Sequence, residues 1–179
     1  GEFNVKQGPV FTNFVLADEV NRAPPKVQSA LLEVMGERQV TLGGQTFEAA
    51  VPFLVLATQN PVEQEGTYPL PEAQTDRFMM KVKVEYPNRK EEEQILHRMA
   101  NLRDKTTINA VLSLEDLLEM RKLVDDIYID EKVNHYILDI IFATRTPKDA
   151  GVEIQDLLDF GASPRASIAL SLASKAHAF

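Results

Sequence analysis

Two adjacent carboxylates, Asp18 and Glu19, follow a short apolar run at Phe14–Ala17. Such a pair can divide the work of phosphoryl transfer. One carboxylate can hold Mg²⁺, usually through water, while the other orients and deprotonates an attacking water. The same two residues could instead cap the next helix or face solvent, because acids after short apolar runs are common. The pair therefore raises a hypothesis that needs further residues.

Three more polar side chains could belong to the same chemistry. Asn60 follows a second apolar run, and its amide can position a water by donating and accepting hydrogen bonds; alternatively, it is a turn residue before a proline. Arg77 and Arg165 offer the guanidinium donors that a transferring phosphoryl group needs. Singly, each arginine is more simply explained as a surface residue or a partner of an acid such as Asp76. Together with Asp18 and Glu19, these residues favour a phosphate site.

The elements that position the carboxylates and Asn60 are predicted by apolar patterns. Phe14–Ala17 and Phe53–Ala57 are uninterrupted apolar runs, typical of strands covered on both faces. Between them, apolar residues at helical spacing predict a helix over about 24–36, and the Gly43-Gly44 turn predicts a hairpin over 39–47. Two buried strands separated by a helix and a hairpin indicate an α/β fold with a parallel sheet, whose functional groups gather at the carboxyl ends of its strands.

Less regular segments flank this unit. Phe3–Val5 alternates like a short strand, and Phe78–Tyr86 alternates like a further one. Gln64–Pro71, with its glycine and two prolines, is predicted to be a loop.

Beyond residue 87 the pattern becomes all helical. Helices are expected at about 89–101, 114–125, 130–144 and 164–178, with Asn88, Ser113, Asp130 and Ser163 placed to cap them. We therefore expect a boundary near 87, with the α/β part at 1–87 and a helical part at 88–179.

Composition excludes several classes of protein. The 179 residues are 44% hydrophobic and 26% charged, which is ordinary for a globular chain. The net charge of −8 argues against a sequence-independent grip on nucleic acid, which needs a positive surface. The sequence has no cysteine, no apolar run long enough to span a bilayer and no secretory leader at Gly1–Val5, so a cytoplasmic location is the simplest expectation.

Other catalytic arrangements find little support. His97, His135 and His177 are scattered without acidic partners at metal-binding spacing, and we interpret them as surface or helix-packing residues. No G-x-S-x-G motif occurs in the sequence.

The ordered set of carboxylates, amide and arginines resembles the AAA+ ATPases, and the surrounding residues are similar to the MoxR branch of that family. The resemblance covers nearly the whole chain. It is carried by Gly8-Pro9-Val10-Phe11, Leu16 to Lys26, Gln28 to Glu33, Ala57 to Pro61, Gly66 to Gln74, Asp76-Arg77-Phe78 and Ser163-Pro164-Arg165.

The resemblance implies a role for each site residue. Asp18 and Glu19 would be the Walker B pair, with Asp18 serving Mg²⁺ and Glu19 activating water. Asn60 would be the sensor 1 residue that aligns this water with the γ-phosphate of ATP. Arg77 would be the arginine finger that reaches into a neighbouring subunit, and Arg165 the sensor 2 residue of a helical lid.

The family also implies an assembly. Its members form rings, usually of six subunits, in which ATP hydrolysis moves the lid to remodel a client protein, often with a partner that bears a von Willebrand factor A domain. Arg22 could serve the subunit interface, although a structural role is as reasonable.

The chain departs from the family in one respect: it contains no G-x-x-x-x-G-K-[ST] segment, the loop that cradles the phosphates. We therefore expect a fragment, natural or artificial, that is inactive alone, with Gly1–Val10 the tail of an insert. Because strands would be missing from its sheet, the fragment is expected to expose apolar faces and could self-associate. The competing interpretation is a binding module of AAA+ shape that docks to subunits or clients without hydrolysing ATP.

Overall fold

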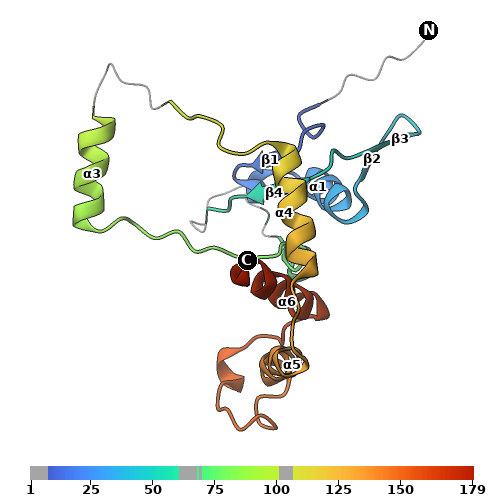
Figure 1. The fold of residues 1–179 in the computed structure, drawn as a ribbon, viewed down its shortest axis with the longest axis vertical. Helices are drawn as coiled ribbons and strands as arrows, with labels where there is room; N and C mark the ends of the chain where they lie inside the picture. The colour runs from blue at the N-terminus through green and yellow to red at the C-terminus, as the bar shows by residue number, and fades with distance from the viewer. Residues whose placement is uncertain (1–7, 61–67, 69, 101–106) are drawn as a thin grey trace.

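The computed structural model describes residues 8–60, 68, 70–100 and 107–179 (Figure 1). The predicted strand at Phe3–Val5 and most of the predicted loop at Gln64–Pro71 lie outside these residues. Within them, all strands lie before residue 58 with a helix between the first and second strands, and only helices follow, which confirms the predicted α/β class. Among the described helices, none combines the length and apolarity needed to cross a membrane.

The central feature is a parallel pair of strands, β1 (Phe14–Ala17) and β4 (Leu54–Ala57), as the apolar runs predict. Phe14 pairs with Leu54 and Ala17 with Ala57, so the two strands end level with one another. Parallel strands need a crossover connection, and the segment between them provides it.

The predicted full burial of these strands is wrong. Phe14, Leu16, Leu54 and Leu56 share one face of the pair and remain 48–68% exposed. The face is open because no described element covers it, whereas a strand in the middle of a sheet is covered on both sides.

The crossover contains the helix and the hairpin that the sequence predicts. It begins with a single 3-10 turn, η1 (Val20–Arg22), and continues into α1 (Pro25–Glu37), whose first residue is a proline preorganised for helix entry. The hairpin consists of β2 (Gln39–Leu42) and β3 (Gln45–Glu48) around Gly43 and Gly44, both at positive φ.

The predicted strand at Phe78–Tyr86 is absent. The short helix α2 (Glu72–Thr75) ends just before it, and the following residues run without regular structure, with Val82 75% and Tyr86 100% exposed. Alternation alone does not make a strand, because its backbone groups need a partner. The ladders of the described residues join β1 to β4 and β2 to β3, so neither supplies one.

All four predicted helices of the second half are confirmed: α3 (Arg89–Met99), α4 (Leu114–Asp126), α5 (Glu131–Arg145) and α6 (Pro164–Ala178), with a 3-10 turn η2 (Gln155–Leu157) before α6. The side chains of the four predicted capping residues accept hydrogen bonds from the first-turn amides. The capping residues therefore fix where each helix begins.

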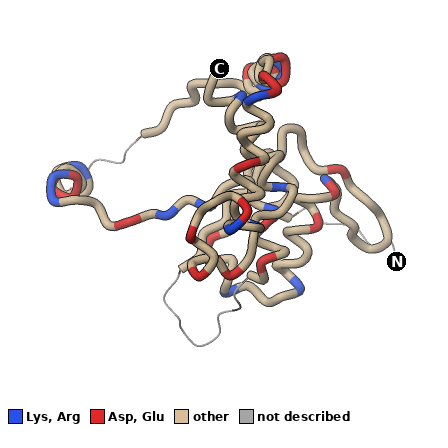
Figure 2. The backbone as a smooth tube through the Cα atoms, turned by 90° about the horizontal axis from the view of Figure 1, so that it is seen from below, with Lys and Arg blue, Asp and Glu red and all other residues tan. Residues whose placement is uncertain are grey.

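The helices differ in how they pack. α6 contacts both α5 and α4, and Ile137 and Ile141 of α5 are buried. By contrast, α3 lies away from the rest of the molecule (Figure 1). Lys and Arg are interspersed with Asp and Glu along the described chain (Figure 2).

Gly161 is a point of close approach in the helical half, and Gly161→Ala is expected to destabilise the fold. A Cβ at this position would lie 2.8 Å from the Arg145 Cα and 2.9 Å from the Thr144 carbonyl oxygen. Backbone atoms cannot yield cheaply, so the cost should be about 1–3 kcal/mol in the free energy of unfolding. Urea unfolding of the variant measures it. Gly8→Ala is the control, since no described atom lies within 4 Å of the added Cβ. Equal stability of the two variants would contradict the expectation.

Candidate functional site at the strand ends

The level ends of β1 and β4 bring polar residues of both strands together. Asp18 follows Ala17, and Thr58 follows Ala57, its register partner. The Thr58 Oγ1 donates a hydrogen bond of 2.5 Å to the Asp18 Oδ1. The Asp18 carboxylate is therefore fixed by one oxygen while the residue remains exposed.

Glu19 has an unusual backbone. Its φ and ψ of 47° and 49° lie in the left-handed region, which is costly for a residue with a Cβ. Its amide donates to the Thr58 Oγ1 at 2.8 Å, and its carboxylate forms an ion pair of 3.0 Å with the Arg22 Nε. Arg22 therefore has a local contact with Glu19 in the turn after β1.

Asn60 is joined to the same region through Asn21. The Asn21 Nδ2 donates to the Asn60 carbonyl oxygen at 3.2 Å, and Asn21 is only 8% exposed. Beside it, Gln28 is 3% exposed, and its Nε2 donates to the carbonyl oxygens of Val20, Ala23 and Tyr68. The two buried amides hold the turn after β1 against the segments that follow β4 and precede α2.

Thr58, Asn21 and Gln28 were missed as site residues by the sequence interpretation. A signal existed for Gln28, which precedes the buried Leu32 by four residues and so places an amide on the apolar face of a helix. For Thr58, the signal was its position next to the apolar run that precedes Asn60. We define the strand-end cluster as Asp18, Glu19, Asn21, Thr58 and Asn60.

The donor set of the strand-end cluster suits a hard cation. Its exposed carboxylate, Asp18, supplies oxygen, which Mg²⁺ prefers, and Mg²⁺ commonly keeps several waters and takes one or two protein carboxylates. The described residues contain no group of three or more His, Asp or Glu that could hold a metal by themselves. Asp18 therefore fits a cation held mainly by water and by a ligand's phosphates.

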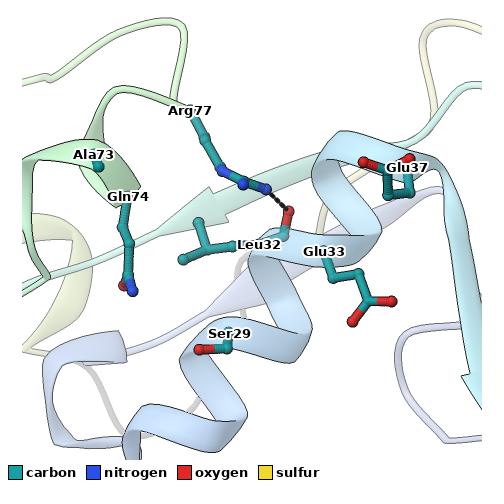
Figure 3. Close-up of a pocket in the computed structure, with 7 residues that line it drawn as sticks. All are labelled: Ser29, Leu32, Glu33, Glu37, Ala73, Gln74 and Arg77. Carbon is teal, nitrogen blue, oxygen red and sulfur yellow. Dashed lines mark hydrogen bonds between the residues drawn. The ribbon is translucent and has the colours of Figure 1, made fainter.

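Arg77 lies against α1 (Figure 3). Its Nη1 donates to the Leu32 carbonyl oxygen at 2.8 Å, and a Cβ on Gly36 would lie 3.1 Å from the same nitrogen. The guanidinium borders an open pocket of about 280 Å³, lined by Ser29, Leu32, Glu33, Glu37, Ala73, Gln74 and Arg77. Two acidic side chains of α1 thus line the same pocket as this arginine.

Arg165, at the start of α6, contacts Asp76. Its Nη1 donates to the Asp76 Oδ2 at 3.2 Å, and the Oγ of Ser163, the capping residue of α6, donates to the Asp76 Oδ1 at 2.5 Å. The Ser163 hydrogen bond, opposed by partial burial and reinforced by Arg165, holds the pKa of Asp76 below its ordinary value of 3.8.

The predicted site residues thus fall into two groups. Asp18 and Glu19 lie at the strand ends and are hydrogen-bonded to Thr58, and Asn60 is joined to the turn after β1 through its backbone carbonyl oxygen. Arg77 and Arg165 lie near one another, because each borders a pocket together with Asp76 and Phe78.

The chain is similar to known proteins over almost all of its length. Residues 1–80 match the family described as ATPase family associated with various cellular activities (AAA). The chain is 48% identical to chaperone MoxR1 of Mycobacterium tuberculosis, over 99% of this chain and 47% of that protein. It is 29% identical to protein MoxR of Paracoccus denitrificans, over 57% of that protein.

A solved structure agrees. The crystal structure of a candidate ATPase from Cytophaga hutchinsonii superimposes with a TM-score of 0.90 at 51% identity, over 99% of this chain and 54% of that chain. This chain therefore spans about half the length of the relatives it matches.

The Asp76 contacts predict a pH-dependent stability. A carboxyl whose pKa is lowered by folding stabilises the fold above its unfolded pKa, and the contribution is lost as the pH falls through the lower folded pKa. At neutral pH, Asp76→Asn is expected to lower the free energy of unfolding by about 1 kcal/mol. The difference from wild type should shrink below about pH 4 and vanish at lower pH. Urea unfolding across this range checks it, with the exposed Asp159→Asn as control; a difference independent of pH would contradict the assignment.

Proposed function

Because the chain belongs to the MoxR family of AAA+ ATPases, we propose that the protein containing it binds and hydrolyses ATP and uses the energy to remodel or mature other proteins. The family consists of ATPases, and a relative in it is named as a chaperone. We propose that the protein containing this chain also turns over ATP. The 179-residue chain contains no phosphate-cradling loop, and we propose that it is inactive alone.

The strand-end cluster is the observation that carries this proposal. We assign Glu19 as the general base for the attacking water, Asp18 as the residue serving Mg²⁺ through water, and Asn60 as the amide that aligns the water. Mg²⁺, when bound, would neutralise charge on the phosphates. The Glu19 carboxylate lies just after the end of β1 and forms an ion pair of 3.0 Å with the Arg22 Nε.

We assign the two arginines to charge stabilisation on the transferring phosphoryl group. Arg77 acts as a finger on a neighbouring subunit, and Arg165 as a sensor on the helical lid. In the structure Arg77 donates to the Leu32 carbonyl, so acting in trans requires it to leave this bond. The proposed division places the core at 1–87 and the lid at 88–179.

The assembly and surroundings follow from the same assignment. We propose a homo-oligomeric ring, usually hexameric in the family, in which each nucleotide site is completed by the next subunit. We also propose that the ring acts on client proteins, works with a partner that bears a von Willebrand factor A domain, and is located in the cytoplasm.

The second candidate function is that of a binding module. An AAA+-shaped module that docks to subunits or clients without hydrolysing ATP would keep this fold. The two functions separate on whether the full-length gene product turns over ATP.

Glu19→Gln in the full-length gene product is expected to lower steady-state ATP turnover by roughly 10²- to 10⁴-fold, the usual contribution of a general base. The substitution keeps the shape of the side chain and removes its basicity, so ATP binding should persist. Turnover and the binding of a fluorescent ATP analogue measure the two effects, and the isolated 179-residue chain should show no turnover.

Glu48→Gln is the matched control, because Glu48 lies on the exposed hairpin strand β3. If wild type and both variants all lack turnover, the docking-module function replaces the ATPase. If Glu19→Gln turns over ATP as fast as wild type, another group is the base.

Arg77→Ala is expected to leave ATP binding nearly intact and to lower turnover by roughly 10³- to 10⁵-fold, as for other arginine fingers. If the finger acts in trans, mixing Arg77→Ala subunits with Glu19→Gln subunits should restore part of the turnover, because some interfaces then combine an intact base with an intact finger. The exposed Arg98→Ala on α3 is the control. Parallel loss of binding and turnover, or no recovery on mixing, would overturn the assignment.

A further inference from the structure

We propose that Thr58 is a positioning residue for the proposed hydrolysis, fixing Asp18 and Glu19 through a single hydroxyl group. The inference rests on the proposed function, since it concerns how the two carboxylates are oriented. It is carried by hydrogen bonds that join the end of β4 to the turn after β1.

All three polar groups of Thr58, its amide, carbonyl and hydroxyl, form hydrogen bonds with the segment Ala17–Val20. Its amide donates to the Ala17 carbonyl oxygen at 3.0 Å, and its carbonyl oxygen accepts from the Val20 amide at 2.9 Å. Between these two bonds its hydroxyl accepts from the Glu19 amide at 2.8 Å and donates to the Asp18 Oδ1 at 2.5 Å. Every residue from Ala17 to Val20 is therefore bonded to Thr58.

The Thr58 hydroxyl must accept one hydrogen bond and donate the other. An amide needs an acceptor, and a carboxylate oxygen needs a donor, so one atom must do both. A hydroxyl can, whereas an aliphatic side chain of the same shape cannot. Loss of the hydroxyl would release the Asp18 side chain and leave the Glu19 amide without this partner.

The Glu19 backbone makes this bond consequential. A non-glycine residue in the left-handed region persists only where its surroundings hold it there. The Thr58 hydroxyl is one such restraint, and it acts on the residue whose carboxylate is assigned as the base. Without it, both the direction of the Glu19 side chain and its distance from an attacking water are free to change.

If Thr58 were only a structural residue, loss of its hydroxyl would mainly lower the stability of the fold, but its surroundings indicate otherwise. Thr58 is exposed, so water can replace its hydroxyl bonds at little cost to the free energy of unfolding. The two backbone hydrogen bonds survive any substitution that keeps the amide. Removing the hydroxyl should therefore affect catalysis far more than stability.

The test compares Thr58→Val, which removes the hydroxyl and keeps the shape, with Thr58→Ser, which keeps the hydroxyl, in the full-length gene product. Thr41→Val removes a hydroxyl from the exposed hairpin and is the matched control. Thr58→Val should lower kcat by roughly 10- to 100-fold, the usual cost of losing a side chain that orients a metal-serving group. It should also raise the Mg²⁺ concentration needed for half-maximal turnover, with ATP binding without Mg²⁺ and the melting temperature close to wild type. Thr58→Ser should restore most of kcat.

Hydrogen exchange of the Glu19 amide gives a readout independent of turnover, and it should become faster in Thr58→Val and not in Thr58→Ser. An unchanged exchange rate, an unchanged kcat in Thr58→Val, or equal damage in both variants would overturn the inference while leaving Glu19 as the base. Absence of turnover in wild type would instead overturn the proposed function and this inference with it. Turnover of the wild-type protein therefore separates the two failures.

Discussion

The pairing of two four-residue strands is the constraint on which the candidate site depends. Because β1 and β4 run parallel and end level at Ala17 and Ala57, the next residue of each strand must lie beside the other. Asp18 and Thr58 are brought together by this register, although forty positions apart in sequence. A shift of the register by one residue would turn the side chains to opposite faces and separate them. The site therefore depends on the backbone ladder before it depends on any side chain.

Two buried side-chain amides stabilise the segments next to this edge of the sheet. Asn21 and Gln28 are almost fully enclosed, and between them they donate to four carbonyl oxygens of surrounding segments. Buried polar groups are costly unless they are hydrogen-bonded, so such residues specify one arrangement of the loops. Among the residues that the structure describes, the Asn21 Oδ1 has no hydrogen-bond partner, so this part of the network is not completely satisfied. This oxygen belongs to the side chain whose Nδ2 donates to the Asn60 carbonyl oxygen, beside the strand-end cluster.

Sequence patterns predicted the elements better than their burial or their contacts. Helix caps such as Asn88 and Ser113 act within one turn, so local sequence determines them. The parallel pair was also predictable, since apolar runs separated by a helix have few other solutions. The exposure of Leu16 and the absence of a strand at Phe78–Tyr86 were not predictable, because burial and strand formation both depend on a partner that pattern alone does not reveal. The Thr58 bonds likewise depend on register, which no single segment contains.

Asp76 and Arg77 are consecutive residues that contact different parts of the molecule. Asp76 accepts hydrogen bonds from Ser163 and Arg165 at the start of α6, while Arg77 donates to α1. The peptide bond between Asp76 and Arg77 therefore links the first turn of α6 to α1. Under the proposed assignment, this unit joins the lid sensor to the finger that serves the neighbouring subunit. A movement of α6 that displaces Arg165 would break its hydrogen bond to Asp76, whose neighbour Arg77 is held against Leu32. The shortest bonded path between the two arginines thus runs from the Arg165–Asp76 hydrogen bond through the Asp76 side chain and one peptide bond to Arg77.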